Sequence, residues 1–312
     1  MLILPKPVKD EFLSGFIRRL CHINFVDSTD EMLRIIRENF NLTNPGRKLE
    51  FKAISLATGM TESEILWNHS HFPINLQFPL RTGLVNYTLE ERRPLGVTPP
   101  EWFRYRLCQN CIEQQTQEHG FRFWNRTHQI PSLYWCPWHK TALRKCRIRP
   151  SESHMPSIDT TDELIPESAE SDIKKYPKIQ YFSDILTSTY KIPYGAKIWS
   201  NESGIKDILR LHGLGDAEIH EKSKYISDLA SRNFPSWWLK KLYEDVRIVR
   251  ETQIPKIDNL LSRWNRRHYE YALAIALLLT PEEWTRYKSQ GDALISIHGI
   301  ERVNARVWES IT

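Results

Sequence analysis

The spacing of apolar residues along the chain predicts a mainly α-helical protein. Near the start, one apolar stripe recurs at helical intervals and is formed by Phe12, Phe16, Leu20 and Ile23. A second helix follows, with Ser28 or Thr29 as its N-cap and acidic residues in its first turn. Further along, the same periodicity, interrupted by Gly and Pro, predicts helices within 175–190, 203–215, 216–234, 235–249, 256–279 and 280–290.

Residues 49–72 predict two short helices separated by a tight turn. The turn falls at Gly59, and the second helix begins with a capping box, in which Thr61 is followed three residues later by Glu64. This spacing is typical of a helix-turn-helix, whose second helix enters the major groove of DNA. The alternative is a plain helical hairpin, because the predicted exposed face is acidic and supplies no Lys or Arg for phosphates.

Charge is distributed unevenly and indicates where domains end. The net charge is +5, but residues 101–149 hold nine basic and three acidic residues, whereas residues 151–172 hold seven acidic and no basic ones. The acidic stretch is rich in Ser, Thr and Pro, which is typical of an exposed linker. We therefore expect a helical N-terminal domain over 1–100, a zinc-finger module over 101–150, an acidic linker over 151–175 and a helical C-terminal domain over 176–312.

Composition is typical of a cytoplasmic protein. No apolar run reaches the length of a membrane helix, and the N-terminal residues lack the pattern of a signal peptide. Cysteines in that compartment stay reduced, so clustered cysteines indicate a metal or catalysis before a disulfide. The eleven tryptophans are large apolar surfaces that belong either in a core or against a partner.

Four residues carry the clearest chemical signal. Cys108 and Cys111 form a C-x2-C pair, and Cys136 and His139 form a C-x2-H pair after an interval of 24 residues. Two such knuckles, each presenting two ligands from a tight turn, are the usual way to build a closed tetrahedral Zn²⁺ site. We therefore predict that these residues bind a structural Zn²⁺ and leave no ligand position open for catalysis.

Other chemistries fit this region less well. A redox C-x-x-C would need a βαβ context, and a deaminase would pair H-x-E with P-C-x-x-C. His128, in a stretch that alternates apolar and polar residues as a strand does, is expected to be an ordinary half-buried histidine, and the alternative is a further metal ligand. Cys21 and Cys146 are expected to be free, buried thiols.

Basic and aromatic residues mark two candidate surfaces. Residues 240–270 hold eight basic and five acidic residues, which is typical of a solvated helix face and also of a nucleic-acid surface. The candidate DNA contacts are Arg122, Arg126, Lys140, Arg144, Lys240, Lys241, Arg263, Arg266 and Arg267. Trp67, Trp237 and Trp238 are candidates for a protein partner, although such residues more often lie in a core.

Several of these stretches resemble the TniQ/TnsD family of transposon target-selection proteins. The shared pattern is two knuckles around an aromatic-rich stretch, carried here by Cys108, Cys111, Gly120, Trp124, His128, Pro131, Cys136, Pro137 and His139. The resemblance covers residues 1–150 and, more loosely, extends through the second half toward the longer TnsD-type members. Gln109 stands where the family usually has proline, and TnsD proteins continue beyond the position of Thr312, which suggests an N-terminal portion of a longer protein.

The resemblance implies a non-catalytic adaptor of DNA transposition in the bacterial cytoplasm, associated with the nucleoid. Such a protein binds double-stranded target DNA and recruits a TnsC-like AAA+ ATPase, which brings in the transposase. The alternative is mainly a protein-interaction adaptor that links a CRISPR effector complex to this ATPase and reads little DNA sequence itself. The sequence shows no P-loop, nucleophile elbow or dinucleotide fingerprint, as expected of an adaptor.

Overall fold

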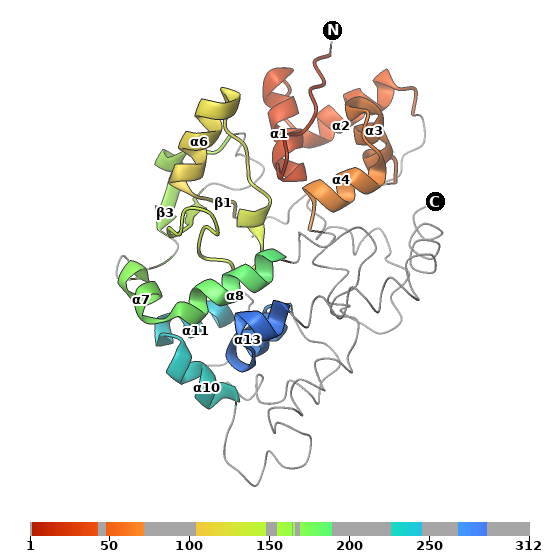
Figure 1. Ribbon diagram of the computed structural model, residues 1–312. Coiled ribbons are helices and arrows are strands. Elements are labelled where there is room, and N and C mark those ends of the chain that lie inside the picture. Colours follow the sequence, from red (N-terminus) through yellow and green to blue (C-terminus); the bar gives the residue numbers. More distant parts are fainter. Residues whose placement is uncertain are drawn as a thin grey trace, which may run out of the picture. The chain divides into compact units, whose positions relative to one another are not determined.

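The computed structural model describes residues 2–42, 48–71, 104–147, 155–163, 165, 169–188, 226–244 and 268–285. Helices predominate in these ranges and strands are few and short, so the prediction of a mainly α fold is confirmed (Figure 1). The described residues divide into two compact units. Unit 1 contains those up to Ile165, and unit 2 contains those from Ala169 onward.

Unit 1 begins with two amphipathic helices, α1 (Leu13–Ile23) and α2 (Thr29–Asn39). The apolar stripe of the first helix is buried, with Phe12, Phe16 and Leu20 at most 1% exposed. Ser28 caps α2, because its hydroxyl accepts a hydrogen bond from the Glu31 N–H at 3.1 Å. The predicted N-cap is therefore confirmed.

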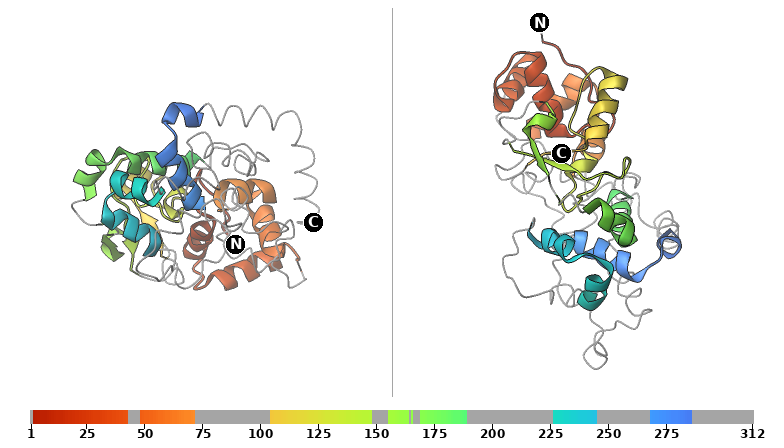
Figure 2. Two further views of the ribbon diagram at one scale, coloured as in Figure 1. Left: turned by 90° about the horizontal axis from the view of Figure 1, so that it is seen from below. Right: turned by 90° about the vertical axis from the view of Figure 1, so that its left-hand side faces the viewer.

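The next two helices, α3 (Lys48–Thr58) and α4 (Glu62–His69), form the predicted helix-turn-helix layout. Gly59 joins them at a φ of +67°, in the left-handed region where a side chain is disfavoured. Thr61 and Glu64 form both hydrogen bonds of the capping box. Figures 1 and 2 show α1 to α4 gathered in one bundle, in which α1 contacts α2, α2 contacts α3 and α3 contacts α4.

The second part of unit 1 is a small sheet with one long helix beside it. The strands are β1 (Arg106–Leu107), β2 (Arg144–Cys146) and β3 (Thr161–Glu163), in the order β1-β2-β3 with antiparallel pairing. Helix α6 (Gln109–His119) follows β1 and ends at Gly120, whose φ is +74°. Two 3₁₀ turns complete this part, η2 (Thr127–Gln129) and η3 (Ile158–Thr160).

The acidic stretch at 151–175, which was predicted to be a linker, contains regular secondary structure. Part of it forms β3, and another part forms the helix α7 (Ala169–Lys175). The register places Arg144 opposite Glu163 and Lys145 opposite Asp162, so each acidic residue faces a basic one across the strands. Opposite charges in this position favour strand pairing, which composition alone does not reveal.

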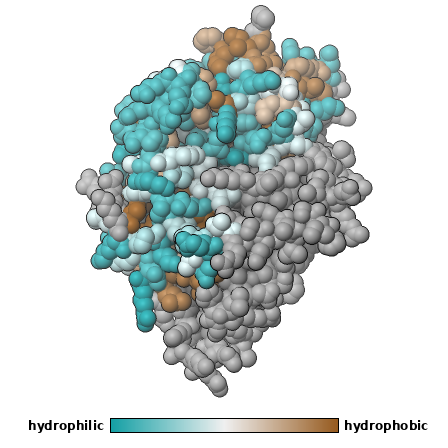
Figure 3. Space-filling view, viewed as in Figure 1, coloured by the Kyte–Doolittle hydropathy of each residue, from teal (hydrophilic) through white to brown (hydrophobic). Residues whose placement is uncertain are grey.

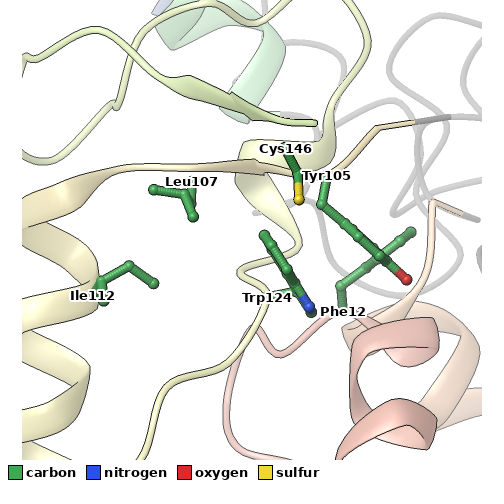
Figure 4. Close-up of a cluster of buried hydrophobic side chains, with 6 residues drawn as sticks. All are labelled: Phe12, Tyr105, Leu107, Ile112, Trp124 and Cys146. Carbon is green, nitrogen blue, oxygen red and sulfur yellow. The ribbon is translucent and has the colours of Figure 1, made fainter. Parts of the chain in front are cut away.

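One buried cluster joins the helical part of unit 1 to the sheet. Its members come from the residues directly before α1 and β1, from β1, α6 and β2, and from the loop after α6: Phe12, Tyr105, Leu107, Ile112, Trp124 and Cys146 (Figure 4). Tyr105 stacks on Trp124 with ring centroids 4.4 Å apart. The Phe12 N–H also donates to the Trp124 carbonyl oxygen at 2.7 Å. The two parts therefore share a core and a backbone contact.

The alternating stretch between the knuckles does not form the strand that its pattern predicts. Phe123 and Trp124 are neighbours in sequence and both are buried, which a half-buried strand does not allow. Its backbone pairs with the segment before α1 at a single isolated bridge, between Glu11 and Asn125. The Gln129 side chain pairs with the backbone of Arg106, accepting from its N–H at 2.9 Å and donating to its carbonyl at 2.8 Å. The strand expected from the alternation is therefore wrong.

Unit 2 is helical in its described part. It contains α8 (Pro177–Ser188), α10 (Ile226–Asn233), α11 (Ser236–Glu244) and α13 (His268–Leu278), each within a stretch predicted to be helical. Helix α13 packs along α8, and Trp238 of α11 fills the core between Phe182 and Phe234. The helix predicted within 203–215 lies outside the described residues. None of the described helices combines the length and apolar character needed to cross a bilayer.

Gly15 allows α1 to approach the shared core closely. A Cβ atom at this position would lie 2.8 Å from the Trp124 side chain, which is itself stacked and buried. We expect Gly15→Ala to lower the free energy of unfolding by about 1–3 kcal/mol, because Trp124 has no room to move. Urea denaturation followed by circular dichroism would measure this change.

Lys52→Ala, on the exposed side of α3, is the control for this substitution and should change stability by no more than about 0.5 kcal/mol. Equal stability of Gly15→Ala and the unaltered protein would contradict the close packing of α1 on Trp124.

Candidate metal centre

The two knuckles meet in unit 1 and bring their four side chains together. Cys108 lies at the N-terminal end of α6, directly after β1, and Cys111 lies in the first turn of the helix. Cys136 and His139 lie in a tight turn, which is closed by the Lys140 N–H donating to the Cys136 carbonyl at 3.0 Å. The ligand atoms of all four residues lie within 4.8 Å of one another. The predicted grouping is therefore confirmed.

Three of four distances between the ligand atoms match those around one tetrahedral ion, and the fourth, from His139 Nδ1 to the Cys111 sulfur, is shorter. A Zn²⁺ with bonds of about 2.3 Å to sulfur and about 2.0 Å to nitrogen implies ligand separations of roughly 3.5–3.8 Å. The Cys111 and Cys136 sulfurs are 3.7 Å apart, and His139 Nδ1 lies 3.7, 3.2 and 3.7 Å from the sulfurs of Cys108, Cys111 and Cys136. The three cysteines are buried and His139 is half-buried, so the group is closed to bulk solvent on most sides.

The charges of the three thiols depend on one another. Hydrogen bonds from Cys111 and Cys136 lower the pKa of the Cys108 thiol. The hydrogen bond to Cys108 raises the pKa of Cys111 and raises that of Cys136 to about 12. Three thiolates so close together repel one another, and a bound cation removes this repulsion. The donor set is therefore suited to a divalent metal.

Two further contacts support the sulfur ligands. The His139 N–H points to the Cys136 sulfur at 3.4 Å, and the Thr141 hydroxyl lies 3.3 Å from the Cys108 sulfur. Polar contacts of this kind orient metal ligands and stabilise their charged form. A bound metal would therefore have ligands whose orientation and negative charge are stabilised by neighbouring groups.

His128 lies beside this group and outside it. Its Nε2 is 3.7 Å from the Cys111 sulfur, and the four-residue cluster does not include it. The prediction of half-burial was wrong, because His128 is only 1% exposed. Burial lowers the pKa of His128 to about 4, so its imidazole is neutral near pH 7.

Arg126 lies between the two knuckles and links this part of unit 1 to the part that contains the helices α1 to α4, by hydrogen bonds and an ion pair. Its Nε donates to Asp10 at 3.0 Å, and its Nη1 donates to the carbonyl of Trp67. The Thr127 hydroxyl donates to the second carboxylate oxygen of Asp10 at 2.8 Å. Arg126 is 6% exposed, so its guanidinium is engaged inside the protein and not presented to DNA.

The other predicted DNA contacts occupy varied positions. Arg122, in the loop after α6, and Lys140, directly after His139, are exposed, whereas Arg144 is half-buried and donates to the Thr161 hydroxyl at 2.9 Å. On α11, Lys240 is exposed and Lys241 is half-buried. Arg263, Arg266 and Arg267 lie outside the described residues.

The tryptophans predicted as partner contacts lie mostly inside the protein. Trp67 and Trp238 are 8% and 1% exposed, and half-buried Trp237 donates its Nε1–H to Asp172 at 2.6 Å. Among the residues that the structure describes, the aromatic side chains that are exposed are different ones, Phe25 at 96% and Trp138 at 51%. Trp138 lies within the second knuckle, and that position was the signal in the sequence that could have identified it.

The fold and the site define a helix-turn-helix bundle that shares its core with a module whose Cys3His group could hold a metal ion. Residues 2–143 match the family model described as TniQ, which confirms the resemblance over this range. The match implies a transposition-associated protein. No curated protein matches the chain significantly.

Metal analysis tests the four ligands directly. We expect the purified protein to contain one metal ion per chain and Cys136→Ser to lose it, because three remaining ligands do not close the site. Inductively coupled plasma mass spectrometry measures the content. Metal affinity should also fall as the pH is lowered, since protons compete for the thiolates.

Cys146→Ala is the matched control, because Cys146 is another buried cysteine of unit 1 that lies outside the cluster. It should retain the metal. Full metal content in Cys136→Ser would rule out the proposed ligand set.

Proposed function

We propose that this chain is a non-catalytic selector of target sites in DNA transposition, which binds double-stranded DNA and recruits a TnsC-like AAA+ ATPase. The TniQ match over residues 2–143 is the observation that supports this proposal most strongly. Family members act as adaptors between a target and the transposition machinery. The ATPase in turn would bring in the transposase.

In this function the metal centre would have a structural role. We propose that the ion is Zn²⁺, since three thiolates and one imidazole form a common ligand set for structural zinc. Cys108, Cys111, Cys136 and His139 would fill all four positions. A filled tetrahedral site leaves no place for a substrate or for an activated water, which agrees with a non-catalytic role.

The DNA contacts that we propose are two exposed cations of unit 1, one in the loop after α6 and one directly after the second knuckle. Arg122 lies in the loop after α6, and Lys140 closes the second knuckle with a φ of +54°. Both side chains project from backbone that the metal would hold rigid, and cations of this kind bind phosphates without reading sequence. Exposed Lys240 on α11 is a further proposed contact in unit 2.

Helix α4 is less suited to contact phosphates. Glu64 and Asn68 are exposed and Glu62 is half-buried, so the surface of the helix is acidic, and Trp67 is buried. An acidic helix approaching DNA would repel the phosphates at close range. In this proposal α4 stabilises the bundle, and the region around the metal faces the DNA.

A second candidate is a protein-interaction adaptor that links a CRISPR effector complex to the ATPase. Exposed apolar side chains favour it. The Asn24 side chain exchanges two hydrogen bonds of 2.8 Å with the backbone of Ile3, which holds Ile3 against the residue that precedes Phe25. Ile3 is 55% and Phe25 is 96% exposed, and Figure 3 shows apolar surface in this region of unit 1. Exposed apolar groups of this size are common at protein interfaces.

Gel-shift assays on a random duplex over a range of salt concentrations test DNA binding. We expect affinity to fall steeply with salt, and the slope of log K against log[salt] to decrease by about 2 in Arg122→Gln/Lys140→Gln, because two phosphate contacts are lost. The combined change of Arg263, Arg266 and Arg267 tests the second basic segment in the same way.

Arg34→Gln/Lys52→Gln removes the same charge from the exposed faces of α2 and α3 and should leave the slope unchanged. If both double variants behave alike, a general charge effect and not a local DNA contact explains the binding.

Recruitment of the ATPase tests the adaptor role. We expect Phe25→Ser to reduce co-purification of the purified ATPase by at least about tenfold, because a large exposed aromatic side chain often contributes more than 1.4 kcal/mol to an interface. Size-exclusion chromatography with and without duplex DNA measures it. Leu56→Ser, at another exposed apolar residue, is the control. Unchanged recruitment by Phe25→Ser would remove this surface from the proposal.

A further inference from the structure

His128 makes a contact with the metal centre that the four-ligand set leaves unexplained. Its Nε2 is 3.7 Å from the Cys111 sulfur, within the range of a hydrogen bond to sulfur. The residue is 1% exposed, so water does not compete for this contact. A buried imidazole beside a metal ligand is either a ligand itself or a hydrogen-bonding partner of one.

The positions of the four predicted ligand atoms show which of these two roles His128 has. His139 Nδ1 lies 3.7, 3.2 and 3.7 Å from the three cysteine sulfurs, which places it at one corner of a tetrahedron. The group of four within 4.8 Å is complete without His128. The contact of His128 is therefore with the sulfur and not with the centre of the tetrahedron.

The direction of the hydrogen bond follows from the chemistry of the sulfur. A cysteine bound to a metal is a thiolate, which has no proton and can only accept. An imidazole nitrogen donates only when it carries a proton, and an unprotonated Nε2 would place its lone pair against those of the Cys111 sulfur, 3.7 Å away. A favourable contact through Nε2 consequently requires the proton on Nε2.

The ring is held in place from several directions. Thr127 before it donates to Asp10, and Gln129 after it pairs with the backbone of Arg106, so both neighbours of His128 are fixed. The edge of the ring packs on Trp138 of the second knuckle, with centroids 5.4 Å apart and planes at 65°. His128 therefore bridges the two knuckles, with Cys111 on one side and Trp138 on the other.

We propose that His128 is a positioning residue of the metal centre, which donates a hydrogen bond from Nε2–H to the Cys111 thiolate without binding the metal. The bond draws negative charge from the sulfur and makes it a weaker target for protons and for electrophiles. It also fixes the direction in which the lone pairs of this sulfur point. The proposal rests on the metal centre and is independent of DNA binding.

Nitrogen NMR on the unaltered protein tests the proposal without any risk of unfolding. The full chain is labelled with ¹⁵N-histidine and loaded with Zn²⁺, and two-bond correlations identify the tautomer of each ring. The signal of His128 is assigned by its loss in His128→Gln. We expect the Nε2–H tautomer with a slowly exchanging proton, and an Nδ1–H tautomer would overturn the proposal.

Substitution measures the contribution of the bond. His128→Phe keeps an aromatic ring against Trp138 but removes the donor, and we expect its Zn²⁺ affinity to fall about 10–100-fold in competition with a chromophoric chelator. His128→Gln retains an N–H donor and should recover part of that loss. His22→Gln changes an exposed histidine on α1 and should have no effect.

Cobalt spectroscopy separates a positioning role from ligation. With Co²⁺ in place of Zn²⁺, His128→Phe should keep intense tetrahedral d–d bands, while the sulfur-to-cobalt charge-transfer band moves to lower energy. His139→Phe should lose the tetrahedral bands. The proposal would be overturned by loss of these bands in His128→Phe, by unchanged affinity and charge-transfer energy in that variant, or by absence of metal from the unaltered protein.

Discussion

The crowding of three cysteine sulfurs around one imidazole nitrogen is the constraint on which the metal-binding part of this protein depends. The four atoms lie within 4.8 Å, in a mostly buried environment where three negative charges cannot coexist unaided. A divalent cation turns this repulsion into attraction. It would thereby link the start of α6 to the tight turn at 136–139, two segments that have little other secondary structure to join them. The short β1 and β2 strands, of two and three residues, could not hold them alone.

The helices do not stand apart from this centre. Phe12, at the start of α1, packs in the same cluster as Trp124 and donates a backbone hydrogen bond to it. Asp10 binds both Arg126 and Thr127 from the loop between the knuckles, and the ion pair with Arg126 is largely buried. If a bound metal stabilises the conformation of that loop, these contacts would also stabilise the helical bundle. The exposed cations Arg122 and Lys140 gain a fixed position from the same arrangement.

The features that could be predicted from the sequence are local ones. The capping box of Thr61 and Glu64, the N-cap at Ser28 and the two knuckles are each formed by residues a few positions apart, so spacing alone identifies them. The family pattern between the knuckles was also visible. These signals were enough to predict the helical class and the grouping of the four side chains that could hold a metal ion.

The features that were missed depend on partners distant in sequence. Arg126 was expected on the surface because it is charged, and it is buried because Asp10, 116 residues earlier, neutralises it. The alternating stretch was expected to be a strand, and its backbone pairs with the distant segment before α1 at a single bridge, between Glu11 and Asn125. Likewise, β3 forms because its acidic residues face a basic strand. Periodicity contains no information about such contacts.

The hydrogen bonds and packing around Asp10 and Phe12 have a consequence for how this metal centre can be handled as a piece. Zinc modules are often treated as independent domains that can be transferred from one chain to another. A fragment beginning at residue 101 would contain all four ligands, yet Trp124 would lose the contact with Phe12, and Arg126 would be left as a charge without its carboxylate. The smallest unit that can be transferred between proteins is therefore the bundle together with the metal centre. Recombination that separates the two would have to supply another segment in place of the residues that contact Trp124 and Arg126.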